Sequence, residues 1–182
     1  MINLKRKLFH ISFGTFLLIL TYFLSKNLIT GIILGFWIGL SIFEIIRLKN
    51  EKYLPFKFLW KPLFKPEEAN RINDAWFFLL GVFFASLLLD LERLRAVIGI
   101  LTYCDPLAAI IGSKFGRHKI RNKSVEGSLT FFLSAMVVSI LFLKVLNLEV
   151  LLLCLTLSFV ELLTRRDNLW IPLTASLFFR LY

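Results

Sequence analysis

The stretch CDPLAAIIGSKFGRHKIRNKSVEGS, residues 104–128, places an acid, glycines and cations next to one another in an otherwise apolar chain. Asp105 follows an apolar run, and Gly112 and Gly116 come after the acid. Basic residues then continue up to Glu126. An ionisable side chain at membrane depth costs ~3 kcal/mol or more and usually marks a functional site. The stretch therefore predicts a membrane helix that ends at a functional loop.

The composition indicates an integral membrane protein of one domain. Of the 182 residues, 58% are hydrophobic and 20 are Phe, and the mean hydropathy is +0.76. A soluble domain of this size does not need so many apolar side chains. We therefore expect an all-α, polytopic helical bundle over residues 1–182. Cys104 and Cys154 lie in apolar runs without metal-ligand spacing, which favours two buried thiols over a disulfide or a zinc site.

Apolar runs of about one membrane thickness each predict six or seven transmembrane helices. No strand-like alternation interrupts them. The expected spans are 8–24, 28–46, 74–89, 94–112, 128–143, 149–163 and 168–182. The last two are short, which leaves a homo-oligomer open, because a second copy of the chain could shield them.

Basic residues are unevenly divided between the two sides of this bundle. Most of the 22 Lys and Arg residues fall in the N-terminus and in 47–71, 114–123 and 165–166. By the positive-inside rule, the N-terminus and the long loops are therefore cytoplasmic. These loops account for most of the net charge of +10, so we expect no nucleic-acid partner.

The segment 48–71 mixes lysines with aromatic residues and prolines. Prolines argue against one long helix. Lysines with aromatic rings at the level of the lipid headgroups are typical of a segment that lies on the bilayer. We expect an interfacial cytoplasmic segment that acts as an anchor or as a gate for a lipid.

Ionisable residues in apolar surroundings converge on the same side of the membrane. Under the topology above, each lies in the cytoplasmic half of a span or in a cytoplasmic loop. They are His10, Glu44, Asp74, Asp105, Glu126, Glu161 and Asp167. Their convergence predicts a site on that side. Two of them have simpler readings, since His10 also suits packing and Asp167 also suits a helix N-cap.

Asp105 and the residues after it predict a polar groove. Ala108 or Ala109, Gly112 and Gly116 follow at intervals of three or four and would share one helix face with the acid. Small residues on a face let a second helix or a ligand approach the backbone. An acid on that face suits a hydrated metal ion or a metal-bound phosphate, and also an interhelical polar clamp.

The loop 113–127 supplies the opposite charge. Its cations and hydroxyls are Lys114, Arg117, Lys119, Arg121, Lys123, Ser113 and Ser124. Flexible backbone with such groups suits a cytoplasmic nucleotide-binding loop, although positive-inside charge alone explains part of the lysines. Glu126 could neutralise Lys123 or bind a metal. Carboxylates beside Lys, Arg and glycines indicate magnesium-dependent phosphoryl or nucleotidyl transfer.

Together these stretches resemble the CTP-dependent lipid-alcohol kinases, which are the dolichol, polyprenol and phytol kinases and the CTP-dependent diacylglycerol kinases. CDPLAAIIGSKFG and KSVEGS are similar to the family pattern D-[PT]-x-A-x-x-x-G-x-x-x-G followed by K-[ST]-x-E-G. RKLFHISFG at 6–14, FEIIR at 43–47 and ELLTRRDNLWIP at 161–172 resemble further family stretches.

This resemblance implies a membrane-embedded kinase that moves the γ-phosphoryl group of CTP to the hydroxyl of a lipid alcohol, with Mg²⁺ as cofactor. It implies metal-side acids at Asp105, Glu126 and Asp167, with Lys123 and Glu161 completing the catalytic set. It implies nucleotide contacts at Gly112, Ser113, Gly116, Arg117, Lys123, Ser124, Gly127 and Asn168. It places Arg6, Lys7 and His10 at the substrate mouth.

Three alternatives remain on sequence grounds. A phosphatidate cytidylyltransferase would also use CTP, but its closing G-H-G-G-x-x-D-R-x-D signature is absent, and only TRRDN stands there. A small ion-coupled transporter would also keep acids in the membrane, but the chain has no visible internal repeat. In a structural membrane subunit, the polar residues would be packing clamps. Polyprenol, phytol and diacylglycerol are not separated by the sequence.

Overall fold

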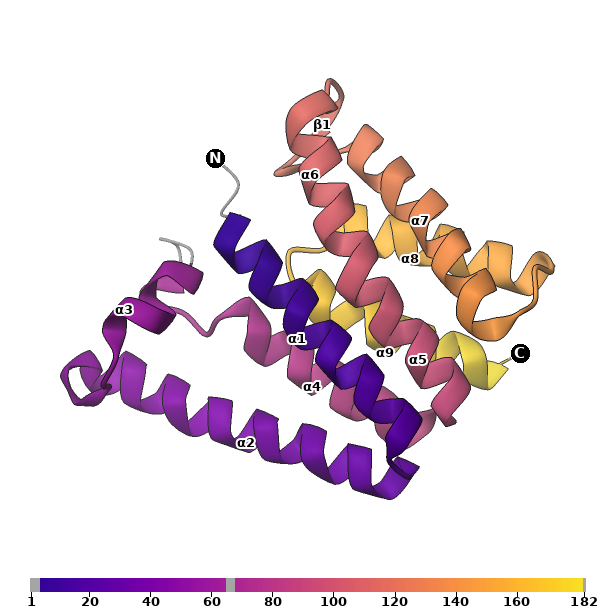
Figure 1. Cartoon of the computed structure of the whole chain (residues 1–182). Helices are drawn as coiled ribbons and strands as arrows, with labels where there is room; N and C mark the ends of the chain where they lie inside the picture. The colour runs from indigo at the N-terminus through magenta and orange to yellow at the C-terminus, as the bar shows by residue number, and fades with distance from the viewer. Residues whose placement is uncertain (1–3, 65–67, 182) are drawn as a thin grey trace.

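The computed structural model describes residues 4–64 and 68–181, which form a helical bundle (Figure 1). The prediction of an all-α fold is confirmed. The α-helices are α1 (Leu4–Phe23), α2 (Lys26–Asn50), α3 (Lys57–Trp60), α4 (Asp74–Leu88), α5 (Leu91–Gly99), α6 (Asp105–Phe115), α7 (Val125–Leu143), α8 (Leu148–Leu163) and α9 (Asp167–Leu181). Shorter elements are the 3₁₀ turns η1 (Glu51–Tyr53) and η2 (Lys61–Leu63), the π-helical turn η4 (Ile100–Cys104), and strands β1 (Lys119–Ile120) and β2 (Lys123–Ser124).

Polar side chains fix where several helices begin. Asn73 accepts a hydrogen bond from the backbone N–H of Trp76 at the start of α4, and Asp90 does the same for α5. Ser124 and Asn147 cap α7 and α8 in the same way. Such caps satisfy N–H groups that have no partner inside the helix, so these short polar turns set the register of long apolar helices.

Three helices are long and apolar enough to cross a membrane by themselves. They cover Lys26–Tyr53, Leu91–Phe115 and Val125–Leu143 within the described residues, and Asp74–Leu88 is a shorter apolar helix. The chain is therefore a multi-pass membrane protein. The count of six or seven spans stays a prediction, and so does the orientation of the bundle.

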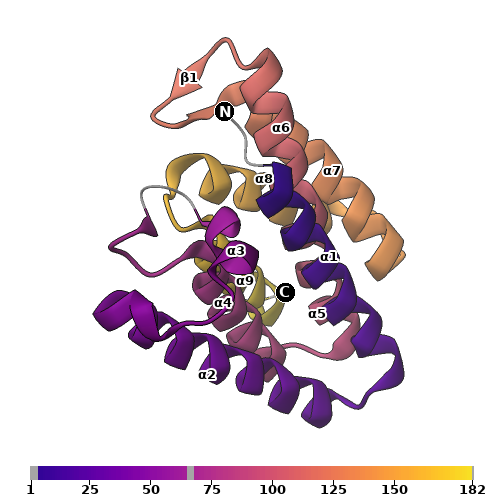
Figure 2. The ribbon, with the colours of Figure 1, turned by 60° about the vertical axis from the view of Figure 1, so that its left-hand side comes forward.

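The predicted grouping of basic segments at one end of the bundle agrees with the arrangement of the helices. The start of α1, the end of α2 and the β1–β2 hairpin lie at one end in both views (Figures 1 and 2). The α1–α2, α4–α5 and α7–α8 turns lie at the other end. The long loops thus share the end at which the ionisable residues gather.

One long helix, built from α5, η4 and α6, runs through the core. Leu94, Ile98 and Leu101 on it are fully buried, and their spacing of three or four residues places them on one apolar face that packs in the core. Its π-helical turn ends immediately before Asp105 and Pro106. Proline has no N–H to donate to the preceding turn, and the Leu101 carbonyl in that turn accepts a hydrogen bond from His10 Nε2 at 2.9 Å. The prediction that Pro106 frees a backbone carbonyl agrees with this contact.

The loop predicted over 113–127 is shorter and more ordered than expected. Helix α6 continues to Phe115, and α7 already begins at Val125. Between them, β1 and β2 pair as an antiparallel hairpin, with Lys119 opposite Ser124. The tight turn places Arg121 in the left-handed region, with φ of 57°. Pairs of strands this short leave no periodicity for a sequence reading to detect.

The segment 48–71 is broken into short turns, as its prolines predict. Tyr53, Phe56 and Phe58 are exposed, with 78%, 66% and 73% of their surface accessible, while the ring of Trp60 packs on Phe43 of α2. Residues 65–67 lie outside the described residues. The location of the 48–71 segment at the bilayer surface stays a prediction.

Helices α4 and α9 pack closely at Gly81, which makes this glycine a sensitive position. A Cβ there would lie 2.5 Å from Pro172 Cγ and 2.8 Å from the Asn168 carbonyl oxygen. We expect Gly81→Ala to lower the free energy of unfolding by about 1–3 kcal/mol through overpacking. Thermal unfolding in detergent, followed by circular dichroism, measures this change.

Gly31→Ala on α2 is the matched control, because nothing lies within 4 Å of a Cβ at Gly31. There alanine should be neutral or stabilise the helix by about 0.5–1 kcal/mol. Equal effects of the two substitutions would contradict the close packing of α4 on α9.

Candidate active site

Lys123 joins the hairpin to two helices through buried carboxylates. Its Nζ lies 2.6 Å from Asp167 Oδ2 and 2.8 Å from Glu161 Oε1, and it also donates to the Glu161 carbonyl oxygen. Ser128 donates to the other carboxylate oxygen of Glu161 at 2.6 Å. The predicted gathering of Lys123, Glu161 and Asp167 at one corner thus agrees with the geometry.

This environment keeps Lys123 charged. Burial on its own would lower the pKa of the ammonium group, but the carboxylates of Asp167 and Glu161 outweigh that effect and the pKa is raised. Lys123 is therefore a permanent cation at neutral pH, held in a fixed place. A fixed cation is suited to stabilise negative charge on a phosphate.

Asp167 is the first residue inside α9 and not the residue that precedes the helix, as an N-cap would be. Its Oδ1 accepts a hydrogen bond from the backbone N–H of Asn168 at 2.9 Å, and its Oδ2 pairs with Lys123. Of the two readings of its sequence position, the contacts favour an ion-pair residue over a helix cap.

A second group of ion pairs lies between α1, α4 and α6. Lys7 Nζ is 3.0 Å from Asp105 Oδ2, and the two side chains are 15% and 14% exposed. Arg6 contacts Asp74 Oδ2 at 2.6 Å. This group and the first are within electrostatic range of each other, because Asp105 is attracted by Lys123 and repelled by Asp167. Asp105 also lines the same cavity as Asn168, the residue after Asp167.

A cavity of about 470 Å³ opens beside Asp105. Its polar lining residues are Arg6, Lys7, His10, Glu68, Asn73, Asp74, Asp105 and Asn168. The predicted mouth residues, Arg6, Lys7 and His10, are therefore all in its lining. The remaining wall is mainly apolar and comes from α1, α2, α4 and the 48–71 segment. A volume of this size is in the usual range for small-molecule sites.

The glycines of the central motif pack helices rather than line an open cradle. A Cβ on Gly127 would lie 2.9 Å from the Ala108 carbonyl oxygen, and one on Gly112 would lie 2.7 Å from Ser124 Oγ. Gly116 is equally close to Ser124. Ser124 itself is buried and caps α7 by accepting from the Gly127 N–H at 3.1 Å. Their place in nucleotide binding stays a proposal, and their visible contacts join α6 to α7.

The other predicted loop residues face outward. Ser113 and Arg117 are exposed. Glu126 accepts from the backbone N–H of His118 at 3.2 Å, and its carboxylate lies 2.8 Å from His118 Nδ1. Glu126 therefore ties the start of the hairpin to α7, and sequence reading did not identify His118 as its partner.

No ready-made metal cluster stands among these residues. Within 4–64 and 68–181, no group of three or more His, Cys, Asp or Glu side chains is placed to hold a metal ion. Asp105 and Asp167 interact with one another, whereas Glu126 has its contact with His118. The metal set Asp105, Glu126 and Asp167 therefore stays a proposal.

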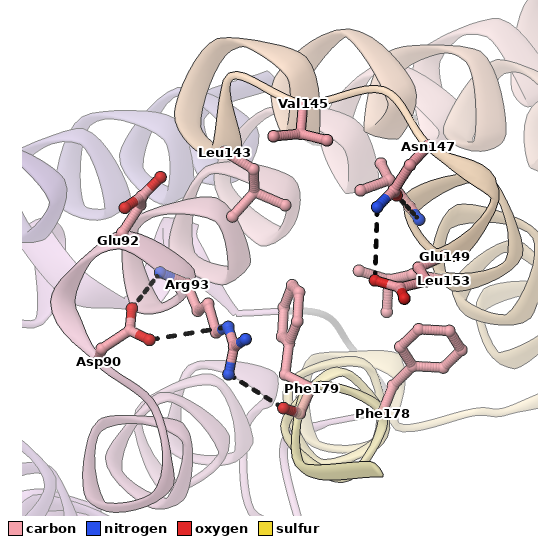
Figure 3. Close-up of a pocket in the computed structure, with 11 residues that line it drawn as sticks. Asp90, Glu92, Arg93, Leu143, Val145, Asn147, Glu149, Leu153, Phe178 and Phe179 are labelled. Carbon is pink, nitrogen blue, oxygen red and sulfur yellow. Dashed lines mark hydrogen bonds and ion pairs between the residues drawn. The ribbon is translucent and has the colours of Figure 1, made fainter. Parts of the chain in front are cut away.

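A second cavity, of about 310 Å³, lies at the opposite end of the bundle (Figure 3). Asp90 there caps α5, and Arg93 donates to the Phe179 carbonyl oxygen at 3.0 Å. Asn147 caps α8 and contacts Glu149. These polar groups are used for helix ends, so the chemistry is better placed at the Asp105 cavity.

Curated proteins similar to this chain are about 30% identical to it over the aligned residues. An uncharacterized protein of Methanocaldococcus jannaschii is 30% identical over 179 residues, which is 93% of this chain and 88% of that protein. The CTP-dependent diacylglycerol kinases 1 of Schizosaccharomyces pombe and Eremothecium gossypii are each 30% identical, over 139 and 140 residues or 71% of this chain. The chain is thus a distant homologue of these CTP-dependent diacylglycerol kinases and of the Methanocaldococcus protein, which is consistent with the CTP-dependent lipid kinase family.

The match to the two named kinases covers 62% of the fission yeast protein and 43% of the other. No family model matches the chain, and no solved structure is similar to it. The resemblance drawn from the sequence is thus confirmed at the level of this lipid kinase family.

Glu44 and Arg47 form a buried clamp that sequence reading noticed as a motif but did not assign to the catalytic or binding residues. Arg47 Nη2 lies 2.8 Å from Glu44 Oε2, and the two side chains are 4% and 3% exposed. Arg47 also donates to the carbonyl oxygens of Glu68, Ala69 and Arg71. The clamp fixes the chain just before Asp74 and thereby the cavity wall. An E-x-x-R pair inside an apolar span was the available signal.

Removing one partner of this clamp leaves a buried charge unpaired. We expect Glu44→Gln to lower the free energy of unfolding by ~3–5 kcal/mol. Glu51→Gln is the control, since Glu51 pairs with Lys57 and Lys61 at 3.7 and 3.4 Å on the surface, where such pairs contribute about 1 kcal/mol or less. Denaturant unfolding of both variants tests the difference, and similar midpoints for the two would contradict a structural clamp.

Proposed function

We propose that this protein is a kinase that transfers the γ-phosphoryl group of CTP to the hydroxyl group of a lipid alcohol. The observation that carries the proposal is that Asp105 lines a cavity with a polar end and a mainly apolar wall and is within electrostatic range of the fixed cation Lys123. Its relatives named as CTP-dependent diacylglycerol kinases supply the donor and the class of reaction.

Each group then has a definite part in the reaction. The hydroxyl oxygen attacks the γ-phosphorus, the bond from that phosphorus to the β-phosphate oxygen breaks, and CDP leaves. Asp105 accepts the hydroxyl proton as general base, while its ion pair with Lys7 at 3.0 Å holds the carboxylate in place. Lys123 stabilises the charge that spreads over the transferring phosphoryl oxygens. Asp167 and Glu161 act by positioning Lys123.

The acids present fit a magnesium–nucleotide complex. Mg²⁺ is usually bound by one or two carboxylates together with substrate phosphates and water, rather than by a full set of protein ligands. Asp105 and Asp167 would hold it, and the ion would offset the negative charge of the phosphates. Glu126 would contribute through the hairpin, because its contact with His118 fixes the loop that carries Lys123.

The nucleotide would lie over the β1–β2 hairpin. The exposed cation Arg117 is available to its phosphates, whereas the Ser113 hydroxyl would first have to leave its hydrogen bond to the Ile110 carbonyl oxygen, at 2.8 Å. The buried Ser124 and the close-packed glycines would hold the hairpin in place, because they join α6 to α7 at its base. With the active site at the end rich in Lys and Arg, the nucleotide would come from the cytoplasm.

Diacylglycerol is the proposed acceptor, since it is the substrate class named for the relatives. Polyprenol and phytol have the same reacting group and are the next acceptors to test. A cytidylyltransferase would release pyrophosphate and not CDP, and a transporter would turn over no nucleotide. The reaction product therefore separates these possibilities.

Purified protein in lipid vesicles should convert CTP to CDP only when a lipid alcohol is present. We expect Asp105→Asn to lower kcat by ~10²–10⁴-fold, as loss of a general base does. Chromatographic separation of CTP, CDP and CMP, with a radiolabelled phosphoryl group traced into lipid, measures the reaction.

Glu149→Gln is the control, because Glu149 is exposed at the opposite end of the bundle, in the lining of the second cavity. This variant should keep the native rate. Pyrophosphate and a cytidylyl lipid as products, or an Asp105→Asn variant with native activity, would overturn the proposed function.

A further inference from the structure

The cavity beside Asp105 continues along an apolar wall to which α1 and α2 contribute. Phe9 and Phe13 of α1 face it from one side, and Gly35, Phe36 and Gly39 of α2 face it from the other. Helix α2 belongs to a segment that is long and apolar enough to cross the membrane. A pocket with charges at one end and such a wall matches a ligand with a polar head and a hydrocarbon tail.

The wall is open where α2 carries its glycines. Nothing lies within 4 Å of a Cβ built on Gly31, Gly35 or Gly39, and all of them are exposed. Gly35 and Gly39 line the cavity, whereas Gly31 does not. The cavity therefore reaches the surface along this face of α2, on the part of the molecule that the lipid tails of a bilayer surround.

At the polar end, a buried hydrogen-bond acceptor has no partner. Asn168 is 6% exposed, lines the cavity, and its side-chain oxygen makes no hydrogen bond in the described part of the chain. Leaving such a group unpaired costs about 1–3 kcal/mol, so a ligand that donates a hydrogen bond would recover this cost. Asn168 is also the neighbour of Asp167, and Asp105 lines the same cavity.

The cations near Asn168 do not favour an anionic ligand. Lys7 is paired with Asp105, and Arg6 with Asp74. A phosphate group entering the cavity would meet these carboxylates at close range and could offer Asn168 no O–H when ionised. A neutral hydroxyl can donate to the Asn168 oxygen without breaking either ion pair.

We propose that this cavity is the acceptor site: a neutral lipid alcohol enters sideways from the bilayer between α1 and α2, with its tail along Gly35 and Gly39 and its hydroxyl donating a hydrogen bond to Asn168 Oδ1. This assignment rests on the proposed function and places Asn168 on the acceptor and not on the nucleotide. Bound in this way, the hydroxyl lies next to Asp105, to which it turns its single O–H when its oxygen attacks the γ-phosphorus.

Protection of an introduced thiol tests the site without any turnover. Gly39→Cys places a thiol on the cavity wall, and Gly31→Cys places one on the same helix outside it. The native Cys104 and Cys154 are fully buried and should not react. Each variant is placed in phosphatidylcholine nanodiscs with or without 1,2-dioleoylglycerol, and the rate of maleimide labelling is measured without CTP.

We expect dioleoylglycerol at ten times its half-saturating level to slow labelling of Gly39→Cys by about tenfold, because labelling follows the unoccupied fraction. Labelling of Gly31→Cys should stay the same. The 3-acetyl ester of dioleoylglycerol, which has no O–H to donate, should protect only at about five- to tenfold higher concentration. In Gly39→Cys combined with Asn168→Ala, alcohol and ester should protect alike.

The outcomes separate this inference from the proposed function. Equal labelling of Gly39→Cys with and without the alcohol, or an unchanged preference for the alcohol after Asn168→Ala, overturns the acceptor site even if the native protein makes lipid phosphate. Protection that depends on Asn168, in a native protein that consumes no CTP, supports the acceptor site and overturns the kinase. Equal protection by alcohol and ester in the Gly39→Cys protein would show a general lipid groove and would also overturn the role of Asn168.

Discussion

The pairing of Lys123 with Asp167 and Glu161 is the interaction on which the rest of the site depends. The hairpin, α8 and α9 are far apart in the sequence, and this one ammonium group holds their ends together at distances of 2.6 and 2.8 Å. Charges in such surroundings are tolerated only when they are paired and hydrogen-bonded. Ser128 and the Asn168 N–H occupy the remaining oxygens of the two acids. A phosphate that approaches Lys123 therefore meets a cation whose position has already been fixed by the fold.

The close packing of α6 against α7 is a second constraint that holds the hairpin and Lys123 in place. Gly112 and Gly127 let the backbones of α6 and α7 come together. The short hairpin that joins these two helices carries Lys123. The same glycines were predicted to admit a nucleotide. In the structure their space is filled by the neighbouring helix and by Ser124, so the open surface on which a nucleotide could lie is that of the hairpin itself.

Much of this arrangement could be predicted from the sequence. Apolar runs and their polar ends give the helices, and the cost of charge in a membrane explains why Arg6, Lys7, His10 and Asp105 share one cavity. The sequence could not identify the contact partner of each charged side chain, because the spacing of residues along the chain does not encode which helix faces which. Glu126 was therefore read as a metal ligand although its contact is His118, and the clamp of Glu44 on the chain before Asp74 was not foreseen. Strands of two residues carry no periodic signal at all.

The π-helical turn before Asp105 has a consequence for the direction in which that carboxylate points. An α-helix turns by about 100° per residue, and a π-helical turn accommodates an extra residue within a helix that otherwise continues. Residues after Ile100–Cys104 are therefore rotated relative to those of α5, although both belong to one span. Without the extra residue of the π-helical turn, the Asp105 side chain would point to the same side as the buried face of α5. A single irregular turn, whose Leu101 carbonyl is hydrogen-bonded to His10 of α1, thus sets the direction in which the Asp105 side chain leaves the span.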